Sequence, residues 1–376
     1  MGGQAPTRHA LRVPLTLLAA LGGALICVWL GTPIPWMLGP LLVTGIASVL
    51  GAPTASAGLL RNAGQWVIGA ALGLYFTPQV GALLVQLWWA IVLGVAWALA
   101  LGALFGVWLT RRHEKDLSHL SPEQFRATTY FASAIGGASE MTLLAERAQA
   151  RTDLVAAAHS LRLVMVVVAL PFAMQWAQRH WGLTVDESLR PAPGQVHVMG
   201  LLALAMATLV GAAVMQWLGR TNPWFMGALL VAMALSLLGL QWSAIPPWMS
   251  NAAQLFIGVS LGVRFQREFV ATAPRWMASV AWGTAVMMGL CLLFGLAMAS
   301  LTGLHPATLI LGTSPGGITE MAITAKVLQL GAPVVTAFQV SRLVAVLVLA
   351  APVFDWLQSR ARQRTARARD GNGTNG

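Results

Sequence analysis

The sequence predicts an all-α polytopic membrane protein built from two homologous halves, and three observations support this fold class. Of the 376 residues, 57% are hydrophobic and 9% are charged, whereas an ordinary soluble domain has about 25% charged residues. The hydrophobic residues form a dozen runs of roughly membrane-spanning length between Leu15 and Leu357, which leaves no room for a soluble domain. In addition, one series of motifs occurs twice in the same order.

Four motifs carry this duplication. PWMLG at 35–39 returns as PWFMG at 223–227, and NAGQWVIGAALGLYF from Asn62 returns as NAAQLFIGVSLGVRF from Asn251. AIGGASEM at 134–141 returns as SPGGITEM at 314–321, and RLVMVVVALPF from Arg162 returns as RLVAVLVLAAPVF from Arg342. The offset falls from 189 to 180 after the second motif, where the first half carries the polar loop RRHEKDLSHLSPEQFR. The pattern indicates a duplication with one loop insertion in the first half.

Each half contains six apolar segments, which define the predicted elements. The first membrane repeat covers 1–180, with segments near 13–31, 35–51, 64–77, 82–110, 127–148 and 153–176. A polar linker at 181–196 leads to the second repeat at 197–359, with segments near 197–218, 223–240, 251–265, 276–302, 305–328 and 332–357. The first run lacks a clean cleavage site and is interpreted as a retained helix. The last residues, 360–376, contain five arginines and are expected to form a basic disordered tail.

The positions of Lys and Arg predict how these segments cross the membrane, because cytoplasmic loops carry the excess. If the two glycine-containing segments enter and leave on one side, ten segments cross and the halves have opposite orientations. Then 18 loop and tail Lys/Arg face the cytoplasm, and only Arg179, Arg190 and Lys326 lie outside. If all twelve cross, the counts are 14 and seven. The sequence favours two inverted repeats with about ten crossings and two broken or re-entrant segments, and twelve crossings is the alternative. Both termini are then cytoplasmic in a multi-pass protein of the bacterial inner membrane.

The segments AIGGASEM and SPGGITEM are expected to break in the middle. Irregular backbone within a membrane persists only where it lines a cavity or is buried in protein. A second half-helix would begin at or just after the glycines, and its free N–H groups suit an anion or a carboxylate. Pro315 would end the preceding half-helix, whereas the first copy has Ile135 at this position. The predicted binding residues here are Gly136, Gly137, Ser139, Glu140, Ser314, Pro315, Gly316, Gly317, Thr319 and Glu320, with Ser139 and Thr319 as caps.

Each glutamate is followed 22 residues later by an arginine, Arg162 in the first half and Arg342 in the second. A carboxylate inside a membrane is costly unless it is paired or hydrated. Both arginines lie too deep in the next apolar run to reach the interface easily. The repeated spacing predicts two ion pairs, Glu140–Arg162 and Glu320–Arg342. These pairs either surround a binding cavity or only lock the helices together.

Further polar residues recur on the apolar segments. Asn62 with Gln65, and Asn251 with Gln254, share one face of a helix, where they either line the cavity or bridge helices by hydrogen bonds. His159, whose counterpart is Gln339, either relays protons or is a packing histidine. The two cysteines, Cys27 and Cys291, are isolated in apolar runs, so neither a disulfide nor a metal site is expected. No cofactor is expected either, because the chain has no Walker loop or dinucleotide fingerprint.

The paired GG-[AI]-[ST]-E-M motifs, each followed by an RLV segment, resemble the AbrB family of bacterial membrane proteins over nearly the whole chain. The resemblance rests on Gly136, Gly137, Glu140, Met141 and Arg162, and on Gly316, Gly317, Glu320, Met321 and Arg342. Members of that family are labelled either as regulators of gene expression or as ammonia monooxygenases. The seven histidines are scattered singly, which disfavours a copper or iron oxygenase, and no DNA-reading domain has room in the chain.

The sequence therefore predicts a carrier that resembles secondary transporters and moves a small anionic solute, and it predicts no enzymatic activity. The expected partners are the lipid bilayer, the solute and a coupling ion, either H⁺ or Na⁺, with no nucleic acid. A homo-oligomer is left open. The alternative function is a membrane-bound sensor or regulator that binds a ligand without moving it and affects gene expression indirectly.

Overall fold

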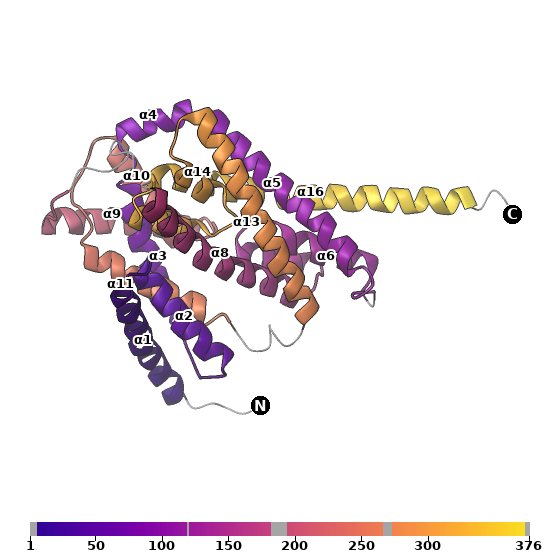
Figure 1. The fold of residues 1–376 in the computed structure, drawn as a ribbon, viewed down its shortest axis with the longest axis horizontal. Coiled ribbons are helices and arrows are strands. Elements are labelled where there is room, and N and C mark those ends of the chain that lie inside the picture. The colour runs from indigo at the N-terminus through magenta and orange to yellow at the C-terminus, as the bar shows by residue number, and fades with distance from the viewer. Residues whose placement is uncertain (1–5, 119, 182–193, 266–272, 373–376) are drawn as a thin grey trace.

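The computed structural model describes residues 6–118, 120–181, 194–265 and 273–372, which are helical apart from short connections (Figure 1). The helices of the first repeat are α1 (Pro6–Trp29), α2 (Pro35–Val49), α3 (Gly58–Gly73), α4 (Pro78–Gln86), α5 (Trp88–His113), α6 (Pro122–Ser133), α7 (Ala138–Arg147) and α8 (Thr152–Trp181). Those of the second are α9 (Val198–Trp217), α10 (Pro223–Leu237), α11 (Pro247–Gly262), α13 (Pro274–Thr302), α14 (Pro306–Thr313), α15 (Ile318–Val327) and α16 (Ala332–Asn372). Most of the predicted linker at 181–196, including Arg190, lies outside the described residues.

The predicted all-α fold class is confirmed, and each predicted apolar segment coincides with a helix or a helix pair. In the part of the chain that the structure describes, six helices are long and apolar enough to cross a membrane on their own, namely α1, α5, α8, α9, α13 and α16. The helices α2, α3, α10 and α11 have 15 or 16 residues each. That length is about 24 Å of helix, so each covers most of a hydrocarbon core of about 30 Å.

The two repeats are inverted relative to each other. Their equivalent helices α5 and α13 lie antiparallel. The His113 ring, at the end of α5, lies 5.1 Å from the ring of Trp276, at the start of α13. Nearer the other ends of these helices, the ring centroids of Trp97 and Phe294 are 4.6 Å apart. Because equivalent helices run in opposite directions, the repeats have opposite orientations, as the Lys/Arg distribution predicts.

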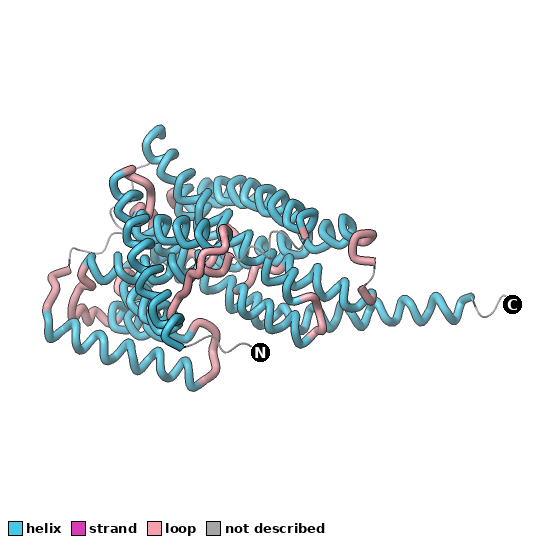
Figure 2. Tube along the Cα trace, turned by 90° about the horizontal axis from the view of Figure 1, so that it is seen from below, coloured by secondary structure: helices cyan, strands magenta, loops and turns pink. Residues whose placement is uncertain are grey.

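The helices, which Figure 2 shows from below, form two groups, and the contacts between helices show that each group has contributions from both repeats. In the first group, α1, α2 and α3 pack against α9, α10 and α11; the second group contains α5 to α8 and α13 to α16. Glycines allow the helices of the first group to approach closely. A Cβ atom on Gly69 of α3 would collide with the carbonyl of Phe225 in α10, and one on Gly258 of α11 would collide with that of Met37 in α2. Each repeat therefore completes its packing on the other repeat.

Both glycine-containing segments enter and leave on the same side of the bundle. In the first repeat, Ser121 at the start of α6 and Ala148 at the end of α7 line one shallow cavity. In the second, the Thr308 hydroxyl near the start of α14 donates to the Leu330 carbonyl beyond α15 at 3.1 Å. This re-entrant geometry agrees with the ten-crossing prediction.

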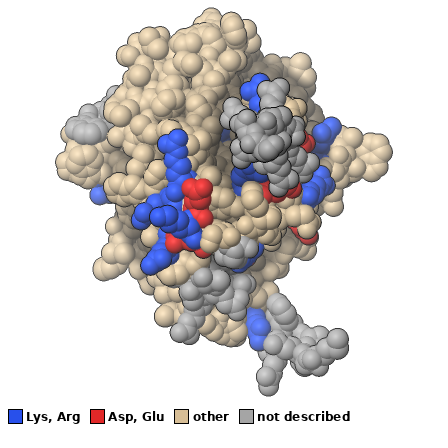
Figure 3. Space-filling view, turned by 90° about the vertical axis from the view of Figure 1, so that its right-hand side faces the viewer, with Lys and Arg blue, Asp and Glu red and all other residues tan. Residues whose placement is uncertain are grey.

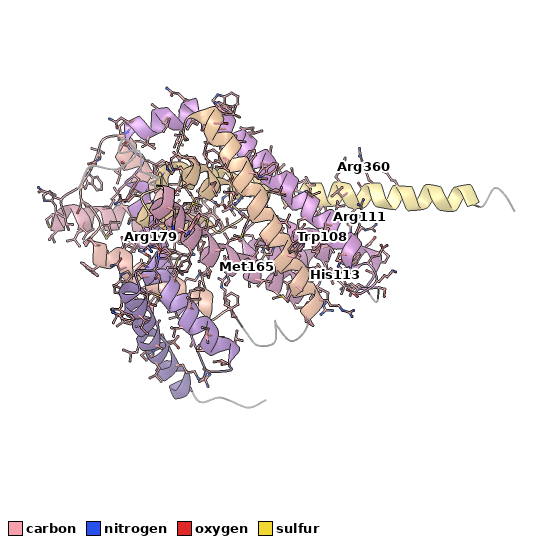
Figure 4. The ribbon with its side chains drawn as sticks, viewed as in Figure 1. Trp108, Arg111, His113, Met165, Arg179 and Arg360 are labelled. Carbon is pink, nitrogen blue, oxygen red and sulfur yellow. The ribbon has the colours of Figure 1, made fainter. Side chains whose placement is uncertain are left out.

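Charged side chains gather at the end of the molecule from which α16 extends (Figure 3). Arg111, His113 and Arg360 lie at this end, and Arg179 lies at the opposite end (Figure 4). Arg179 donates there to the carbonyl of Gly31, just beyond α1. One prediction differs from the structure: α16 continues as a helix to Asn372 through the segment predicted to be disordered. This segment consists largely of Ala, Arg and Gln, which favour helix.

Candidate functional site

The two breaks between half-helices have the same backbone conformation. α6 ends at Ser133 and α7 begins at Ala138, and α14 ends at Thr313 and α15 begins at Ile318. The first residue of each loop is extended, with ψ of 137° at Ala134 and 148° at Ser314. Pro315 therefore does not cause the break, because the first repeat breaks in the same way with Ile135 in its place.

The glycine pair makes room for two side chains that fold back over the loop. None of the four loop glycines is among the positive-φ residues, so backbone strain does not explain them. A Cβ atom on Gly136 or Gly316 would meet the side chain of Met141 or Met321, respectively. A Cβ atom on Gly317 would meet the carboxylate of Glu320, and one on Gly137 would meet the carboxylate of Glu140. This close approach accounts for the G-G-x-x-E-M spacing.

Arg162 and Arg342 hold the carbonyls at the ends of the first half-helices. The Arg162 guanidinium donates to the carbonyls of Ala132 and Ala134, at 2.5 and 2.9 Å. The Arg342 guanidinium donates to those of Ser314 and Gly316, at 2.5 and 2.6 Å. A helix that stops inside protein leaves its last carbonyls unbonded, and its C-terminal end carries partial negative charge. A guanidinium with a planar fork of donors satisfies both requirements.

His159 and Gln339 repeat this arrangement one helical turn earlier. The Nε2 atom of His159 lies 2.9 Å from the Phe131 carbonyl, and Nε2 of Gln339 donates at 2.7 Å to the Leu311 carbonyl, which is its equivalent. Both side chains are buried, with exposed fractions of 4% and 0%. His159 therefore contacts a helix end, and its role as a proton relay or as a packing residue stays a prediction.

The predicted ion pairs are not present. Among the residues that the structure describes, neither glutamate has an arginine within ion-pair distance. Instead, each glutamate is the third residue of its half-helix and folds back on that helix's N-terminal end, where Glu320 accepts a hydrogen bond from its own N–H. The helix N-terminus carries partial positive charge and free donors, so it stabilises the carboxylate. Acid and base therefore bind opposite ends of two different half-helices.

The predicted capping role of Ser139 and Thr319 is wrong. The N-cap positions of α7 and α15 are Gly137 and Gly317, without a side-chain cap. Ser139 is exposed and Thr319 is buried, each as the second residue of its half-helix. The N–H groups at the start of α7 and α15 were expected to be free for an anion. The carboxylates of Glu140 and Glu320 cover them instead and occupy the position expected for the anion.

Two arginines that the sequence did not single out face the glutamates from the other group of helices. Arg264, just beyond α11, interacts electrostatically with Glu140, with Glu320 and with Arg61 of α3. Arg264 also lines a small cavity with His159 and with Ala138, the first residue of α7. The only signal in the sequence was a positive charge at the end of an apolar segment, which is common in membrane proteins.

The remaining predicted residues lie mainly where α3 and α11 cross. Gln65 and Gln254 are buried, and Asn62 and Asn251 are half-buried; the Oε1 atom of Gln254 has no hydrogen-bond partner in the described structure. At the far end of α15, Lys326 donates to the Ser250 hydroxyl of α11 at 3.0 Å. Polar groups thus extend along the boundary between the two helix groups.

The resulting centre contains two pairs of helix ends with more positive than negative side chains. Arg162 and Arg342 are buried and repel each other electrostatically, and the half-buried Arg61 and Arg264 interact electrostatically with Glu320. The centre thus has four arginines and two carboxylates, and the carboxylates are already stabilised by helix ends. A surplus of positive charge attracts an anion.

Comparison with known proteins agrees with this architecture. Residues 36–358 match the family model described as "Transition state regulatory protein AbrB". The chain is 25% identical over 367 residues to "Uncharacterized protein YhjN" of Bacillus subtilis (strain 168), covering 90% of each protein. It is 24% identical over 338 residues to "Putative regulator AbrB" of Escherichia coli (strain K12), covering 89% of this chain and 93% of the relative. The family match spans both repeats and both broken segments, and the chain therefore belongs to the AbrB family.

Proposed function

We propose that this protein is a secondary carrier of a small anionic solute in the bacterial inner membrane. The observation that carries the proposal is the pair of broken half-helices, one per inverted repeat, between two helix groups. Inverted repeats with discontinuous helices at mid-depth are the arrangement that secondary transporters use for substrate and coupling ions. A static structural protein has no need for two buried breaks, each held by charged side chains.

The charges around the breaks support an anionic solute. Arg61 and Arg264 of one helix group face Glu140 and Glu320 of the other. A carboxylate or an inorganic anion that enters between the groups would meet the two arginines first. The glutamates would then bind the coupling ion, because a carboxylate on a helix end can take up a proton or coordinate Na⁺ when an anion competes for the same donors.

The division into two helix groups supports alternating access. Contacts within each group are extensive, whereas the contacts between the groups involve mainly α3 and the short helix α4, which connects α3 to α5. Movement of one group against the other would expose the charged centre to either side of the membrane in turn. The half-helices would move as units, because Arg162 and Arg342 bind the loops between them.

The experiment is a flux measurement in proteoliposomes with a panel of small carboxylates and inorganic anions. Glu140→Gln and Glu320→Gln should abolish counterflow. Glu146→Gln is the matched control, because Glu146 lies on α7 in the same half-helix and is exposed, and it should retain wild-type flux. Binding of an anion without flux in the wild type would overturn transport in favour of a sensor, the role that the name of the Escherichia coli relative suggests. We further propose that the protein is not an enzyme; stoichiometric copper or iron in purified protein would contradict that statement.

A further inference from the structure

An apolar groove of about 740 Å³ lies on the outside of the second helix group, between α5, α6 and α16. The α5 wall consists largely of small residues, including Ala98, Gly102 and Gly106. Tyr130 of α6 forms part of the floor and donates from its hydroxyl to the Ala350 carbonyl of α16 at 2.9 Å. The groove therefore has walls from three helices that are joined across its base.

One end of the groove carries two positive charges without a partner. Arg111 of α5 and Arg126 of α6 line this end, and no Asp or Glu is among the lining residues. Within the described residues, neither guanidinium has a hydrogen bond or an ion pair, and the Nε atom of Arg126 is buried without a partner. Arg111 is exposed and Arg126 is half-buried, and a half-buried arginine without an acceptor favours an anion from outside the chain.

The shape of the groove matches one leaflet of a bilayer. From Arg111 to Ala98 the groove follows 13 residues of α5, which is about 20 Å of helix and comparable with half of a bilayer about 40 Å thick. Its charged end lies at the end of the molecule where charged side chains gather, near the point where α16 leaves the bundle (Figure 4). Its apolar end reaches the middle of the bundle at Ile135. A membrane lipid has the same arrangement, with a charged headgroup at the surface and an apolar tail that reaches toward the middle of the bilayer.

The second repeat has filled the equivalent space. At the offset of 189 residues, Ala98 corresponds to Met287 and Gly102 to Cys291, and both larger side chains are buried. Gly106 corresponds to Gly295; Ser133 of α6 lies close to Gly106, whereas the larger Ile310 of α14 packs against Gly295 of α13. Larger side chains of the second repeat therefore occupy the space that small residues leave open in the first.

We propose that this groove is a binding site for an anionic phospholipid of the surrounding bilayer. The phosphate binds Arg111 and Arg126, and one acyl chain lies along α5 between α6 and α16. Arginine is suited to this contact, because its planar fork of donors binds phosphate in two places. The acyl chain packs against Ser133 and Ala134 at the end of α6. The carbonyls of these two residues accept hydrogen bonds from Arg162. A lipid in this position supports the broken segment from outside.

The first experiment measures lipid retention on purified full-length protein by native mass spectrometry, with phosphatidylglycerol and phosphatidylcholine of identical acyl chains. The wild type should retain one phosphatidylglycerol in preference to phosphatidylcholine. The variant Arg111→Gln/Arg126→Gln should lose this preference, with retention about tenfold weaker or more, because it removes two charge-assisted contacts to the phosphate. Arg112→Gln is the control, because Arg112 is the exposed neighbour of Arg111 and does not line the groove.

The second experiment fills the groove. Ala103→Phe places a ring at an exposed groove-lining position, and Leu104→Phe adds the same ring at the exposed neighbour outside the groove. Ala103→Phe should displace the lipid, whereas Leu104→Phe should retain it. Both variants should elute at the wild-type volume in size-exclusion chromatography, which checks that they are folded. Equal retention of the two lipids, or retention unchanged in Arg111→Gln/Arg126→Gln, would overturn the proposal in favour of ordinary surrounding lipid. The wild type could instead form a dimer that retains no lipid and that Ala103→Phe dissociates. That result would overturn the lipid proposal and would indicate that a second copy of the protein occupies the groove.

Discussion

Replacing Arg342 with methionine tests whether the arginines hold the broken segments together. Arg342→Met keeps a similar length but removes both donors to the carbonyls of Ser314 and Gly316. The Ser314 carbonyl keeps its hydrogen bonds from the Gly316 N–H and from Nε2 of Gln339, whereas the buried Gly316 carbonyl loses its side-chain donor. An unsatisfied buried group costs about 1–3 kcal/mol, so the free energy of unfolding should fall by about 1–3 kcal/mol. Arg342→Lys should recover only part of the loss, because an ammonium is a point charge without the fork of a guanidinium.

The assay is unfolding of the purified protein in mixed micelles with an increasing fraction of denaturing detergent. A double-mutant cycle with Glu320→Gln then distinguishes the observed contacts to helix ends from a direct ion pair between Glu320 and Arg342. Because Glu320 binds the start of α15 and Arg342 binds the end of α14, the two changes should be nearly additive, with a coupling energy below about 1 kcal/mol. A buried ion pair would instead show single losses of about 3–5 kcal/mol that the double variant largely restores. Such restoration, or an Arg342→Met variant as stable as the wild type, would refute the reasoning.

Three further predictions follow from packing and threading. Gly69→Ala should lower the free energy of unfolding by about 1–3 kcal/mol, because its Cβ atom collides with a backbone carbonyl of α10; Gly22→Ala, with no atom within 4 Å of its Cβ, should be neutral in the same detergent titration. Tyr130→Phe should cost about 1 kcal/mol, because it removes the hydrogen bond between α6 and α16, and a loss near zero would contradict that contact. In intact cells, an impermeant thiol reagent should label Arg179→Cys and spare Arg147→Cys, since the native cysteines are buried and the two positions lie on opposite sides of the bundle; rapid labelling of both would contradict the ten-crossing threading.

Much of the fold could be predicted because the duplication makes each predicted segment occur twice in the chain. The motif at Asn62 and its copy at Asn251 placed α3 and α11, and the glycine motifs placed both breaks within a few residues. The Lys/Arg distribution predicted the inverted orientation, which the antiparallel packing of α5 on α13 confirms. Local composition is sufficient for these features, since apolar length, glycine position and loop charge act within single segments.

The partners of the charged residues could not be predicted in the same way. The repeated spacing between glutamate and arginine suggested an ion pair, because opposite charges in an apolar setting are usually paired. In the structure, helix ends take the place of the opposite charge: carbonyls bind Arg162, and the start of α15 binds Glu320. Helix ends have no sequence signature of their own inside a broken segment, so this exchange of partners is visible only in three dimensions.

What the sequence determined by itself is therefore the set of apolar segments, their inverted duplication and the two breaks, because each depends on residues that are close in the chain. Only the tertiary structure decided which surfaces meet. It placed Arg264, from the end of α11, beside glutamates on α7 and α15, and it left a groove in the first repeat where Met287 and Cys291 fill the second. The contacts of Arg264 join residues more than 50 positions apart, and both outcomes depend on how separate helices pack. The physical reason is that packing selects partners by shape and charge in space, which a periodic apolar pattern does not encode.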